Sequence, residues 1–359
     1  MFEGEMKTAL ADETTPLIFD AWYVACFASE ISTGQILGRR ILGIGVALFR
    51  DASGMIVAMK DRCPHRAFPL SKSMLVDGEV VCGYHGFRFG PNGRCTKVPS
   101  QKHVPPAISV QTYKVRENQG TVWIWMGRSD LADVTPLPTE GIECDPAWRR
   151  VRGEMNMAAS YVHVHENLID LTHLSYLHGN SFADGTYAEA GFTVGVDGNR
   201  VSVRRTISPT LLPPIFATPL KMTGKDAERD VLSTFIGPAL SVTRTRLRSL
   251  VDGPDAPQHE IRAFHFITPK DQHTVTYHYE AAVSFGGPDN DVLAFLEQSI
   301  RNIFEEDRFG LEAIMEVRTS DPEPAREYSV RSDEAGVRVR RILHAMANAA
   351  DREKPHSRM

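Results

Sequence analysis

The fold of this 359-residue chain is decided by Cys63-Pro64-His65-Arg66 and by Cys82-Gly83-Tyr84-His85-Gly86, with sixteen residues between His65 and Cys82. Each stretch offers one thiolate and one imidazole on a turn that proline stiffens or glycine makes possible. Four such ligands can hold a [2Fe–2S] cluster in which two cysteines bind one iron and two histidines bind the other. The two stretches therefore predict an iron–sulfur site that transfers single electrons.

A structural zinc site is the main alternative, because zinc is also held by sets of two cysteines and two histidines. Zinc fingers normally place like ligands next to one another in the sequence. Here each pair is mixed, and one residue separates Cys63 from His65. The order of the ligands favours the iron–sulfur cluster.

The length of the chain fits two domains of ordinary size. The first 130 residues contain short β-favouring runs, separated by turn signals such as Asp51-Ala52-Ser53-Gly54. Residues 129–148 hold three prolines without periodicity and are interpreted as the connection between domains. We therefore expect an α+β protein with domains at 1–145 and 146–359. The β-favouring runs of the first domain are Ile41–Phe49, Met55–Met59 and Thr121–Met126.

Composition limits the range of partners. A net charge of −5 gives no electrostatic case for binding nucleic acid. No apolar run approaches the roughly 18 residues that span a bilayer, and the first residues lack a secretory pattern. Five cysteines fit a reducing compartment. We expect a cytoplasmic protein that binds neither membrane nor nucleic acid.

The second half mixes helices and strands. Tyr161 to His178 is interpreted as a helix that ends at Gly179-Asn180, and a long helix is expected from about Asp291 to Val317. Several β-favouring runs lie between these helices. They are Arg200–Ile207, Ser241–Leu250, Ile261–Ile267 and Thr274–Val283.

The first of these helices carries a candidate metal site. Asp170 and His173 are three residues apart, so they share a helix face and can form a hydrogen bond. His173 and His178 are five apart, which turns them about 140° from one another on a regular helix. We expect the helix to loosen near its end if both histidines bind one metal.

The long second helix supplies the carboxylate that two histidines would need to form a facial Fe(II) site. Asp307 interrupts an apolar stripe at three- and four-residue steps, and an unpaired buried carboxylate costs several kcal/mol unless a cation compensates it. Glu305 and Glu306 lie off the stripe and are interpreted as solvated. The apolar members of the stripe are Leu296, Ile300, Ile303, Leu311 and Ile314.

These motifs resemble the Rieske non-haem iron oxygenases, specifically the aryl O- and N-demethylase branch that includes dicamba and vanillate demethylases. The resemblance rests on the two cluster stretches, on Asn167-x₂-Asp170-x₂-His173-x₄-His178 and on Glu306-Asp307. It covers nearly the whole chain. It implies a Rieske β-domain with a [2Fe–2S] cluster, followed by a helix-grip domain with mononuclear Fe(II). In many members a proline stands at the position of Gly83 and a tryptophan at that of Phe87.

The resemblance also implies roles for residues outside the ligand sets. Asn167 and Asp170 would belong to the catalytic machinery. Asp170 would accept a hydrogen bond from His173 and, across a subunit boundary, one from His85 of a neighbouring chain in a homotrimer. His265 matches a position that contacts substrate in dicamba-type enzymes, and Gln298 stands about where those enzymes place a pocket tryptophan, so both are candidate substrate contacts.

The chain is therefore expected to be the terminal oxygenase of a multicomponent system. No G-x-G-x-x-G fingerprint for a nicotinamide or flavin is found, so a separate reductase or ferredoxin would deliver electrons from NAD(P)H. The expected reaction is hydroxylation of a small aromatic substrate by dioxygen, as O- or N-demethylation with release of formaldehyde. A ring-hydroxylating dioxygenase that forms a cis-diol is the alternative. A non-catalytic electron carrier is a further alternative, but it would need only the two cluster stretches and not the second metal motif. A zinc-stabilised binding module would be colourless, in contrast to a protein with an iron–sulfur cluster.

Overall fold

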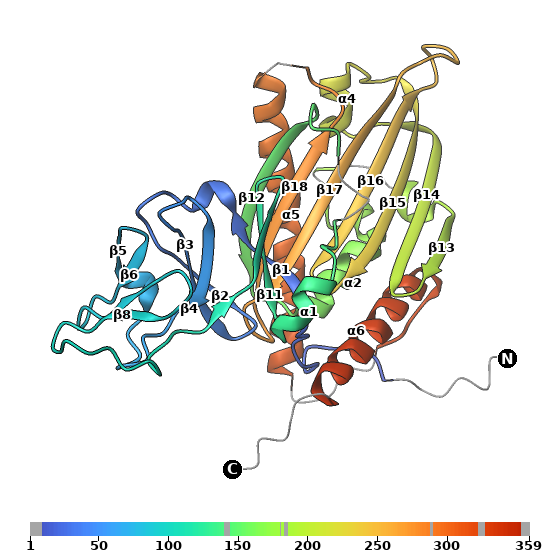
Figure 1. Cartoon of the computed structure of the whole chain (residues 1–359). Coiled ribbons are helices and arrows are strands. Elements are labelled where there is room, and N and C mark those ends of the chain that lie inside the picture. Colours follow the sequence, from blue (N-terminus) through green and yellow to red (C-terminus); the bar gives the residue numbers. More distant parts are fainter. Residues whose placement is uncertain are drawn as a thin grey trace. The chain divides into compact units, whose positions relative to one another are not determined.

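The computed structural model describes residues 9–139, 144–179, 181–182, 186–287, 290–321 and 327–352 (Figure 1). It divides into two compact units. One comprises Leu17–Leu137 with Thr268–Asp271, and the other the rest of the chain, including the first 16 residues. The change of unit after Leu137 lies within the stretch interpreted as a connection. The domain boundary after residue 145 stays a prediction.

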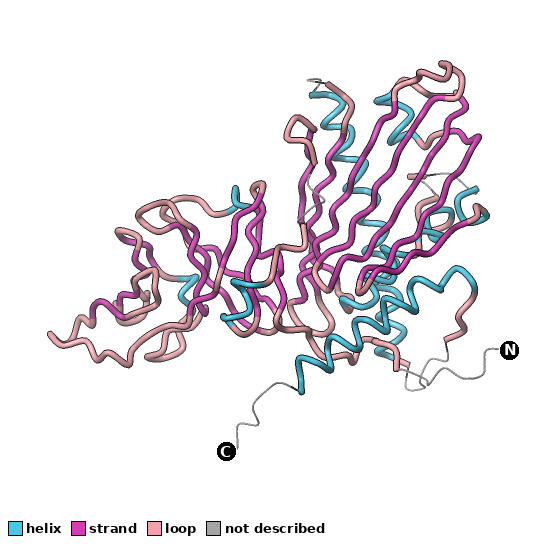
Figure 2. Tube along the Cα trace, turned by 45° about the vertical axis from the view of Figure 1, so that its right-hand side comes forward, coloured by secondary structure: helices cyan, strands magenta, loops and turns pink. Residues whose placement is uncertain are grey.

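The unit of Leu17–Leu137 is built from short antiparallel strands in three sheets (Figure 2). Its strand orders are β1-β11-β10, β2-β3-β4-β9 and β5-β6-β7-β8. The cluster loops follow β4 and β6, and their cysteines pack in a core with Phe49, Met59 and Phe89. The strands are β1 (Ala21–Phe27), β2 (Leu37–Ile41), β3 (Ile44–Arg50), β4 (Ile56–Lys60), β5 (Met74–Val76), β6 (Glu79–Val81), β7 (Arg88–Phe89), β8 (Cys95–Lys97), β9 (Thr112–Tyr113), β10 (Val115–Asn118) and β11 (Thr121–Met126).

The structure adds detail to two local expectations in this unit. The run Ile41–Phe49 is split by a hairpin turn at Leu42 and Gly43, whose φ angles of 48° and 79° match the two-residue turn that suits the strand twist. Residues 129–148, interpreted as the connection between domains, begin with a short helix, α1 (Ser129–Val134). This helix has 6 residues, which is too few to show a helical period of apolar residues in the sequence.

The other unit is a seven-stranded antiparallel sheet in the order β12-β18-β17-β16-β15-β14-β13. Helices α2 and α5 contact this sheet and each other. The four predicted strands are confirmed as parts of β14, β16, β17 and β18, and the α+β class with a long C-terminal helix is confirmed. The strands are β12 (Arg149–Met157), β13 (Phe192–Asp197), β14 (Arg200–Leu211), β15 (Asp226–Gly237), β16 (Leu240–Ser249), β17 (Gln258–Pro269) and β18 (Val275–Val283).

The long helix α5 (Asn290–Ser320) confirms the expected apolar stripe, with Asp307 buried in it. One member differs, because Ile314 is exposed and Met315 is buried in its place. The remaining helices are shorter. They are α2 (Tyr161–Ile169), α3 (Thr186–Glu189), α4 (Pro214–Leu220) and α6 (Glu334–Arg352), with 3₁₀ turns η1 (Ala28–Glu30), η2 (Leu70–Lys72), η3 (Leu171–Ser175) and η4 (Arg331–Asp333).

The helix expected from Tyr161 to His178 is interrupted at Asp170. Helix α2 begins with Ser160 as its N-cap, whose side chain accepts the Val162 N–H, and it ends at Ile169. Asp170 has extended backbone angles, and its carboxylate accepts the Thr172 N–H at 3.0 Å to start η3. An aspartate that caps the following turn explains the interruption. The loosening expected before His178 is therefore present, although it begins earlier than predicted.

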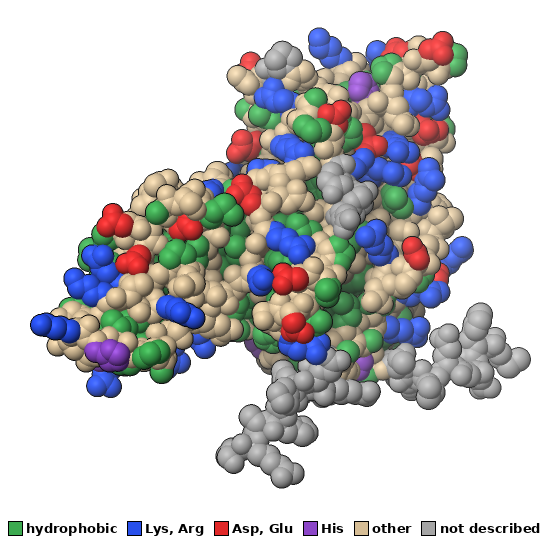
Figure 3. Space-filling view, in the orientation of Figure 1, with side chains coloured by type: hydrophobic (Ala, Val, Ile, Leu, Met, Phe, Trp, Pro, Cys, Tyr) green, Lys and Arg blue, Asp and Glu red, His purple; other side chains and the backbone are tan. Residues whose placement is uncertain are grey.

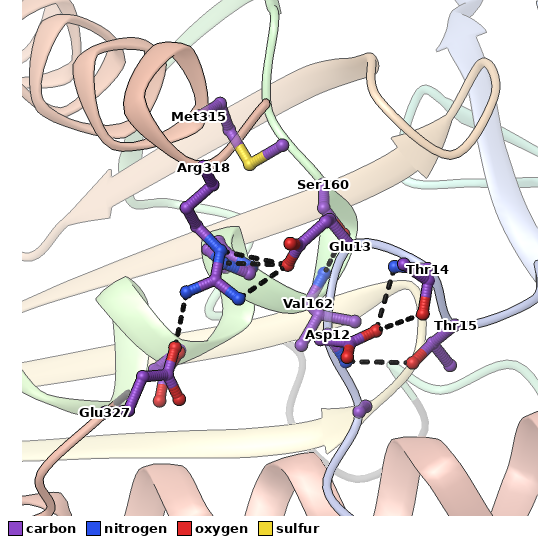
Figure 4. A network of polar contacts seen from close by, with 12 residues as sticks. Asp12, Glu13, Thr14, Thr15, Ser160, Val162, Met315, Arg318 and Glu327 are labelled. Carbon is purple, nitrogen blue, oxygen red and sulfur yellow. Dashed lines mark hydrogen bonds and ion pairs between the residues drawn. The ribbon is translucent and has the colours of Figure 1, made fainter. Parts of the chain in front are cut away.

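An ion-pair network joins the end of α5 to the N-terminal segment (Figure 4). Arg318 Nε donates to Glu13 Oε2 at 2.9 Å, and its Nη1 donates to Glu327 Oε1 at 2.5 Å. Arg340 of α6 donates to Glu327 and to the carbonyl oxygen of Ala11. These contacts bind α5 and α6 to chain segments far apart in the sequence.

In the described part of the chain, no helix has the length and apolar content needed to cross a membrane. On the face shown in Figure 3, basic and acidic side chains are interspersed. This distribution agrees with the mild net charge.

Candidate metal centres

The two predicted cluster loops have the same backbone hydrogen-bond pattern. In each loop the N–H of the cysteine, Cys63 or Cys82, donates to the carbonyl oxygen five residues later, at 2.9 and 2.8 Å. The carbonyl oxygen of each cysteine accepts the N–H four residues later, at 2.9 Å. That fourth residue has a positive φ in both loops, 58° at Ala67 and 71° at Gly86. Two equivalent turns thus present one cysteine and one histidine each.

The two cysteines of these loops are buried, and the two histidines are exposed. Cys63 and Cys82 are each 2% exposed, whereas His65 and His85 are exposed with ring centroids 4.6 Å apart. Burial raises the pKa of the Cys63 thiol, and the adjacent Cys82 opposes its ionisation further. Two buried thiols that resist joint ionisation suit a bound cation, and the donor set fits a cluster with cysteines inward and histidines outward.

The structure explains one of the two departures from the family pattern. The Gly83 N–H donates to Ser73 Oγ at 3.2 Å, a bond that proline could not make. At the other position, Phe87 stacks on the His65 ring with centroids 4.7 Å apart. An apolar ring therefore packs beside this histidine.

The second predicted set converges on one point. Asp307 Oδ1 lies 3.2 Å from His178 Nε2 and 3.4 Å from His173 Nε2. One ligand atom from each residue lies within 4.8 Å of the others. Asp307 comes from α5, His173 from η3, and His178 from the turn after it. Two imidazoles and one carboxylate are the donor set of a facial Fe(II) site.

The outer nitrogens of both histidines have acceptors, which leaves the Nε2 atoms facing Asp307. His173 Nδ1 donates to the backbone carbonyl oxygen of Asp170 at 2.7 Å, and His178 Nδ1 lies 2.7 Å from Glu306 Oε2. Glu306 also accepts a bond from Ser181. The expectation that Glu306 is merely solvated is therefore wrong, because its carboxylate forms hydrogen bonds with His178 and Ser181.

The expected contact of Asp170 is also corrected. His173 bonds the backbone carbonyl of Asp170, not its carboxylate, because the carboxylate caps η3. Asn167 lies at the site itself. Its amide donates to Asp307 Oδ1 at 3.2 Å and lies 3.4 Å from His173 Nε2.

The charges in this set favour a cation. Burial would raise the pKa of Asp307, but hydrogen bonds from His173 and His178 outweigh it and hold this pKa well below its ordinary value. Burial would lower the pKa of His178, yet the two carboxylates on either side raise it. The Asp307 carboxylate is thus ionised although the residue is only 6% exposed. A metal could bind the neighbouring histidine nitrogens in place of protons.

A cavity of about 110 Å³ opens beside the three residues. Its walls are mainly apolar side chains from α2, α4, α5 and the sheet, and its polar lining includes His173, His178 and Asp307. His265 also lines it, and its contact with substrate stays a prediction. Gln298 does not line this cavity; it is exposed on α5 and donates to Asn302, and its contact with substrate stays a prediction.

His265 is held as a neutral imidazole. Complete burial lowers its pKa to about 4. Its Nδ1 lies 2.5 Å from the Tyr277 hydroxyl and its Nε2 lies 3.2 Å from Thr243 Oγ1. Both ring nitrogens therefore have hydroxyl partners, so the hydrogen-bonding capacity of the His265 ring is already used within the protein.

Sequence reasoning missed Glu306, Thr243, Tyr277 and Arg229 at or beside this site. A signal existed for Glu306, since a metal-binding histidine usually has an acceptor for its other nitrogen. Thr243, Tyr277 and Arg229 lie on strands whose register the sequence does not reveal. Arg229 lines the cavity at 2% exposure.

Comparison with known proteins covers both units. Residues 21–114 match the Rieske [2Fe-2S] domain, and residues 157–349 match the vanillate O-demethylase oxygenase C-terminal domain. The chain is 29% identical to the vanillate O-demethylase oxygenase subunit of Pseudomonas sp. (strain HR199 / DSM 7063), covering 93% of this chain and 96% of that one.

Two further likenesses concern dicamba enzymes. The dicamba O-demethylase oxygenase component of Stenotrophomonas maltophilia is 30% identical, over 91% of this chain and 97% of its own. A crystal structure of dicamba monooxygenase with non-haem iron and dicamba superimposes with a TM-score of 0.78 at 26% identity, covering 94% of this chain and 99% of that one.

Proposed function

The chain belongs to the Rieske non-haem iron oxygenases of the vanillate O-demethylase branch, and from this we propose that it is the terminal oxygenase of a multicomponent monooxygenase. Its reaction is the oxidative O- or N-demethylation of a small aromatic substrate. The observation that carries this proposal is the convergence of His173, His178 and Asp307 on the wall of an apolar cavity. Curated relatives that match nearly the whole chain are named O-demethylases, which supports the same reaction.

The two metal centres are assigned to residues of this chain. Cys63, His65, Cys82 and His85 hold the [2Fe–2S] cluster, and His173, His178 and Asp307 hold mononuclear Fe(II). When bound, the cluster passes on single electrons and the Fe(II) activates dioxygen.

The protein positions and shields the reaction. Glu306 orients His178, the Asp170 carbonyl orients His173, and the Asn167 amide holds Asp307. The apolar cavity wall excludes water from the methyl group. In balance, the aryl methyl ether, dioxygen, two electrons and two protons give the phenol, formaldehyde and water.

The size of the cavity limits the substrate. Its volume of about 110 Å³ is comparable to the roughly 150 Å³ of an apolar cavity that accommodates benzene. This volume and the mainly apolar lining support a small aromatic substrate.

The partners follow from the family. The oxygenase receives electrons from NAD(P)H through a separate reductase or ferredoxin, in keeping with the relatives described as a subunit or a component. We further propose a homotrimer of chains with domains at 1–145 and 146–359, in which Asp170 links His173 to His85 of a neighbouring chain.

Turnover of a panel of methoxy- and N-methyl-substituted monocyclic aromatics tests the reaction. The holoenzyme is supplied with a surrogate reductase, NADH and dioxygen, and formaldehyde is measured against dioxygen consumed. We expect one formaldehyde per dioxygen for at least one compound. A cis-diol or a ring-hydroxylated product without formaldehyde would assign the chain to ring hydroxylation instead.

Asp307→Ala tests the iron site in the same assay. We expect turnover to be abolished and mononuclear iron to be lost, because the carboxylate ligand is absent. The visible and EPR spectra of the cluster should be unchanged. Full activity of this variant would show that another residue supplies the carboxylate.

A further inference from the structure

Thr245 places a hydroxyl group on the wall of the cavity. It lies on β16, where alternate residues face the interior, and the cavity lining includes both Thr243 and Thr245. Its cross-strand neighbours, Val231 on β15 and Ile261 on β17, also line the cavity. Thr245 is only 5% exposed. A single hydroxyl therefore interrupts an apolar part of the wall.

This hydroxyl forms no hydrogen bond with any residue that the structure describes. Its oxygen is not one of the fully enclosed polar atoms that lack a partner, so the oxygen remains accessible. Because Thr245 lies on the interior face of β16 and lines the cavity, that access is from the cavity.

The other polar side chains of the lining already have partners. Thr243, roughly 7 Å earlier along the same strand, has its Oγ1 3.2 Å from His265 Nε2. The Asn167 amide donates to Asp307 at 3.2 Å. Among the described residues that line the cavity, Thr245 is thus the polar side chain left without a partner.

A ligand can satisfy this hydroxyl better than water can. A buried hydroxyl without a hydrogen bond is unfavourable, whereas valine would give the wall nearly the same shape without that cost. A well-held water needs two to four polar partners, but the side chains of Val231 and Ile261 on both sides of Thr245 are apolar. An oxygen atom of a ligand is held in place by the rest of the ligand, which fills the apolar cavity.

We propose that Thr245 forms a hydrogen bond with an oxygen atom of a substituent on the aromatic ring of the substrate, such as a carbonyl or hydroxyl oxygen. This inference rests on the proposed function and assigns it a specificity-determining residue. A hydroxyl can donate and accept, so the bond requires no charge on the ligand. Because Thr245 and the metal-site residues line one cavity, the bond limits the orientations in which the ring presents its methyl group to those residues.

Thr276 provides a matched control for the loss of a buried hydroxyl. It lies on β18 of the same sheet, is 8% exposed, and donates to Asn156 Oδ1 at 3.3 Å. Unlike Thr245, it does not belong to the described lining of the cavity. Thr276→Val therefore removes a threonine hydroxyl from this unit and leaves that lining unchanged.

Binding of ligands that differ in one oxygen tests the proposal without turnover. Anaerobic calorimetric titrations of the cluster-loaded protein compare 3- and 4-methoxyacetophenone with 3- and 4-isopropenylanisole, in which CH₂ replaces the carbonyl oxygen. A second set compares 3- and 4-methoxyphenol with the corresponding methylanisoles. The ratio of the two dissociation constants within each pair is measured for the wild type and for each variant.

We expect Thr245→Val to shift this ratio against the oxygen-bearing ligand by about three- to tenfold in at least one pair, as expected for loss of one neutral hydrogen bond. Thr245→Ser keeps the hydroxyl and should keep the wild-type ratio. Thr276→Val should keep it as well. A change of packing alone would weaken both members of a pair and leave their ratio unchanged.

Unchanged ratios in Thr245→Val for every pair would overturn the proposal, and so would a wild type that binds none of the oxygen-bearing ligands. If Thr245→Val does not fold, Thr245→Ala is compared with Thr245→Ser, and equal ratios in these two variants refute the proposal. Formaldehyde assays separate it from the function. Thr245-dependent binding without formaldehyde from any ligand would refute only the demethylase, and formaldehyde release with unchanged ratios would refute only the role of Thr245.

Discussion

At the scale of single residues, the proposed iron site includes groups that contact the proposed ligands as well as the ligands themselves. Glu306 lies next to Asp307 in the sequence, yet it serves a different partner, the outer nitrogen of His178. The neighbouring Glu305 pairs with Arg308 on the exposed side of α5. Two consecutive glutamates on one helix therefore have separate environments, which makes them a matched pair for mutation.

Glu306→Gln should weaken iron binding about 10- to 100-fold, because the neutral amide is a poorer acceptor for His178 and lowers the basicity of its Nε2. Retention of mononuclear iron against a graded chelator measures this effect. Glu305→Gln should retain iron like the wild type. An equal loss of iron in both variants would indicate a general effect of charge on α5 and contradict a specific role of Glu306.

At the scale of elements, the end of α2 places His173. The helix stops at Ile169, and Asp170 caps the 3₁₀ turn that carries this histidine. The Asp170 side chain therefore has a local structural role in addition to any role in electron transfer between subunits.

Asp170→Ala should destabilise this unit by about 1 kcal/mol, the usual cost of losing an N-cap. Asp170→Asn keeps the cap, because its side-chain oxygen still accepts the Thr172 N–H. Thermal unfolding separates the two variants, and turnover then isolates the role of the charge. Comparable unfolding temperatures for Asp170→Ala and the wild type would refute the capping role.

A second link between elements is sensitive to pH. His165 of α2 is fully buried, with Nδ1 3.1 Å from Ser241 Oγ and Nε2 3.0 Å from the Pro238 carbonyl oxygen, and burial lowers its pKa from 6.5 to about 4. The unfolded chain binds a proton at higher pH than the folded chain does. The stability from neutral His165 is therefore complete above about pH 6.5 and is lost as pH falls toward 4.

His165→Gln should flatten the dependence of unfolding free energy on pH in that window. In the wild type, His165 should cause a loss of unfolding free energy on the order of 3 kcal/mol across this window, because its pKa is lowered to about 4 in the folded chain. The variant should not show this loss. Urea unfolding at several pH values between 4 and 7.5 measures it. Substitution of the exposed His103 by Gln is the control, and an identical pH profile for wild type and His165→Gln would contradict the expectation.

At the scale of the whole molecule, the two metal centres belong to separate compact units of one chain. The family resemblance implies that electrons pass from the cluster of one chain to the iron of a neighbouring chain. Chains damaged at different centres should then complement one another within a mixed trimer.

Co-production of His85→Ala and Asp307→Ala chains tests this transfer. Each variant alone should be inactive, because one lacks an intact cluster and the other an iron site. Mixed oligomers, purified through two different tags, should regain a fraction of wild-type formaldehyde release. Inactive mixed oligomers with intact remaining centres would show that electrons stay within one chain.

Local patterns in the sequence were sufficient to predict the architecture and to select the residues of both proposed ligand sets. The order of Cys63, His65, Cys82 and His85 follows from ligand chemistry on tight turns, and the burial of Asp307 follows from the period of one amphipathic helix. Strand positions in the large sheet were recognisable for the same reason, since alternation and β-branched composition are local properties.

Only the tertiary structure decided what surrounds those ligands. Glu306 reaches His178 across 128 residues, and Arg229, Thr243 and His265 share a cavity because adjacent strands place their interior faces together. Such contacts depend on strand register and on where a helix breaks, which propensities do not specify. The chemistry of the metal sites was thus determined by residue type and spacing. The size and the lining of the cavity were determined by packing.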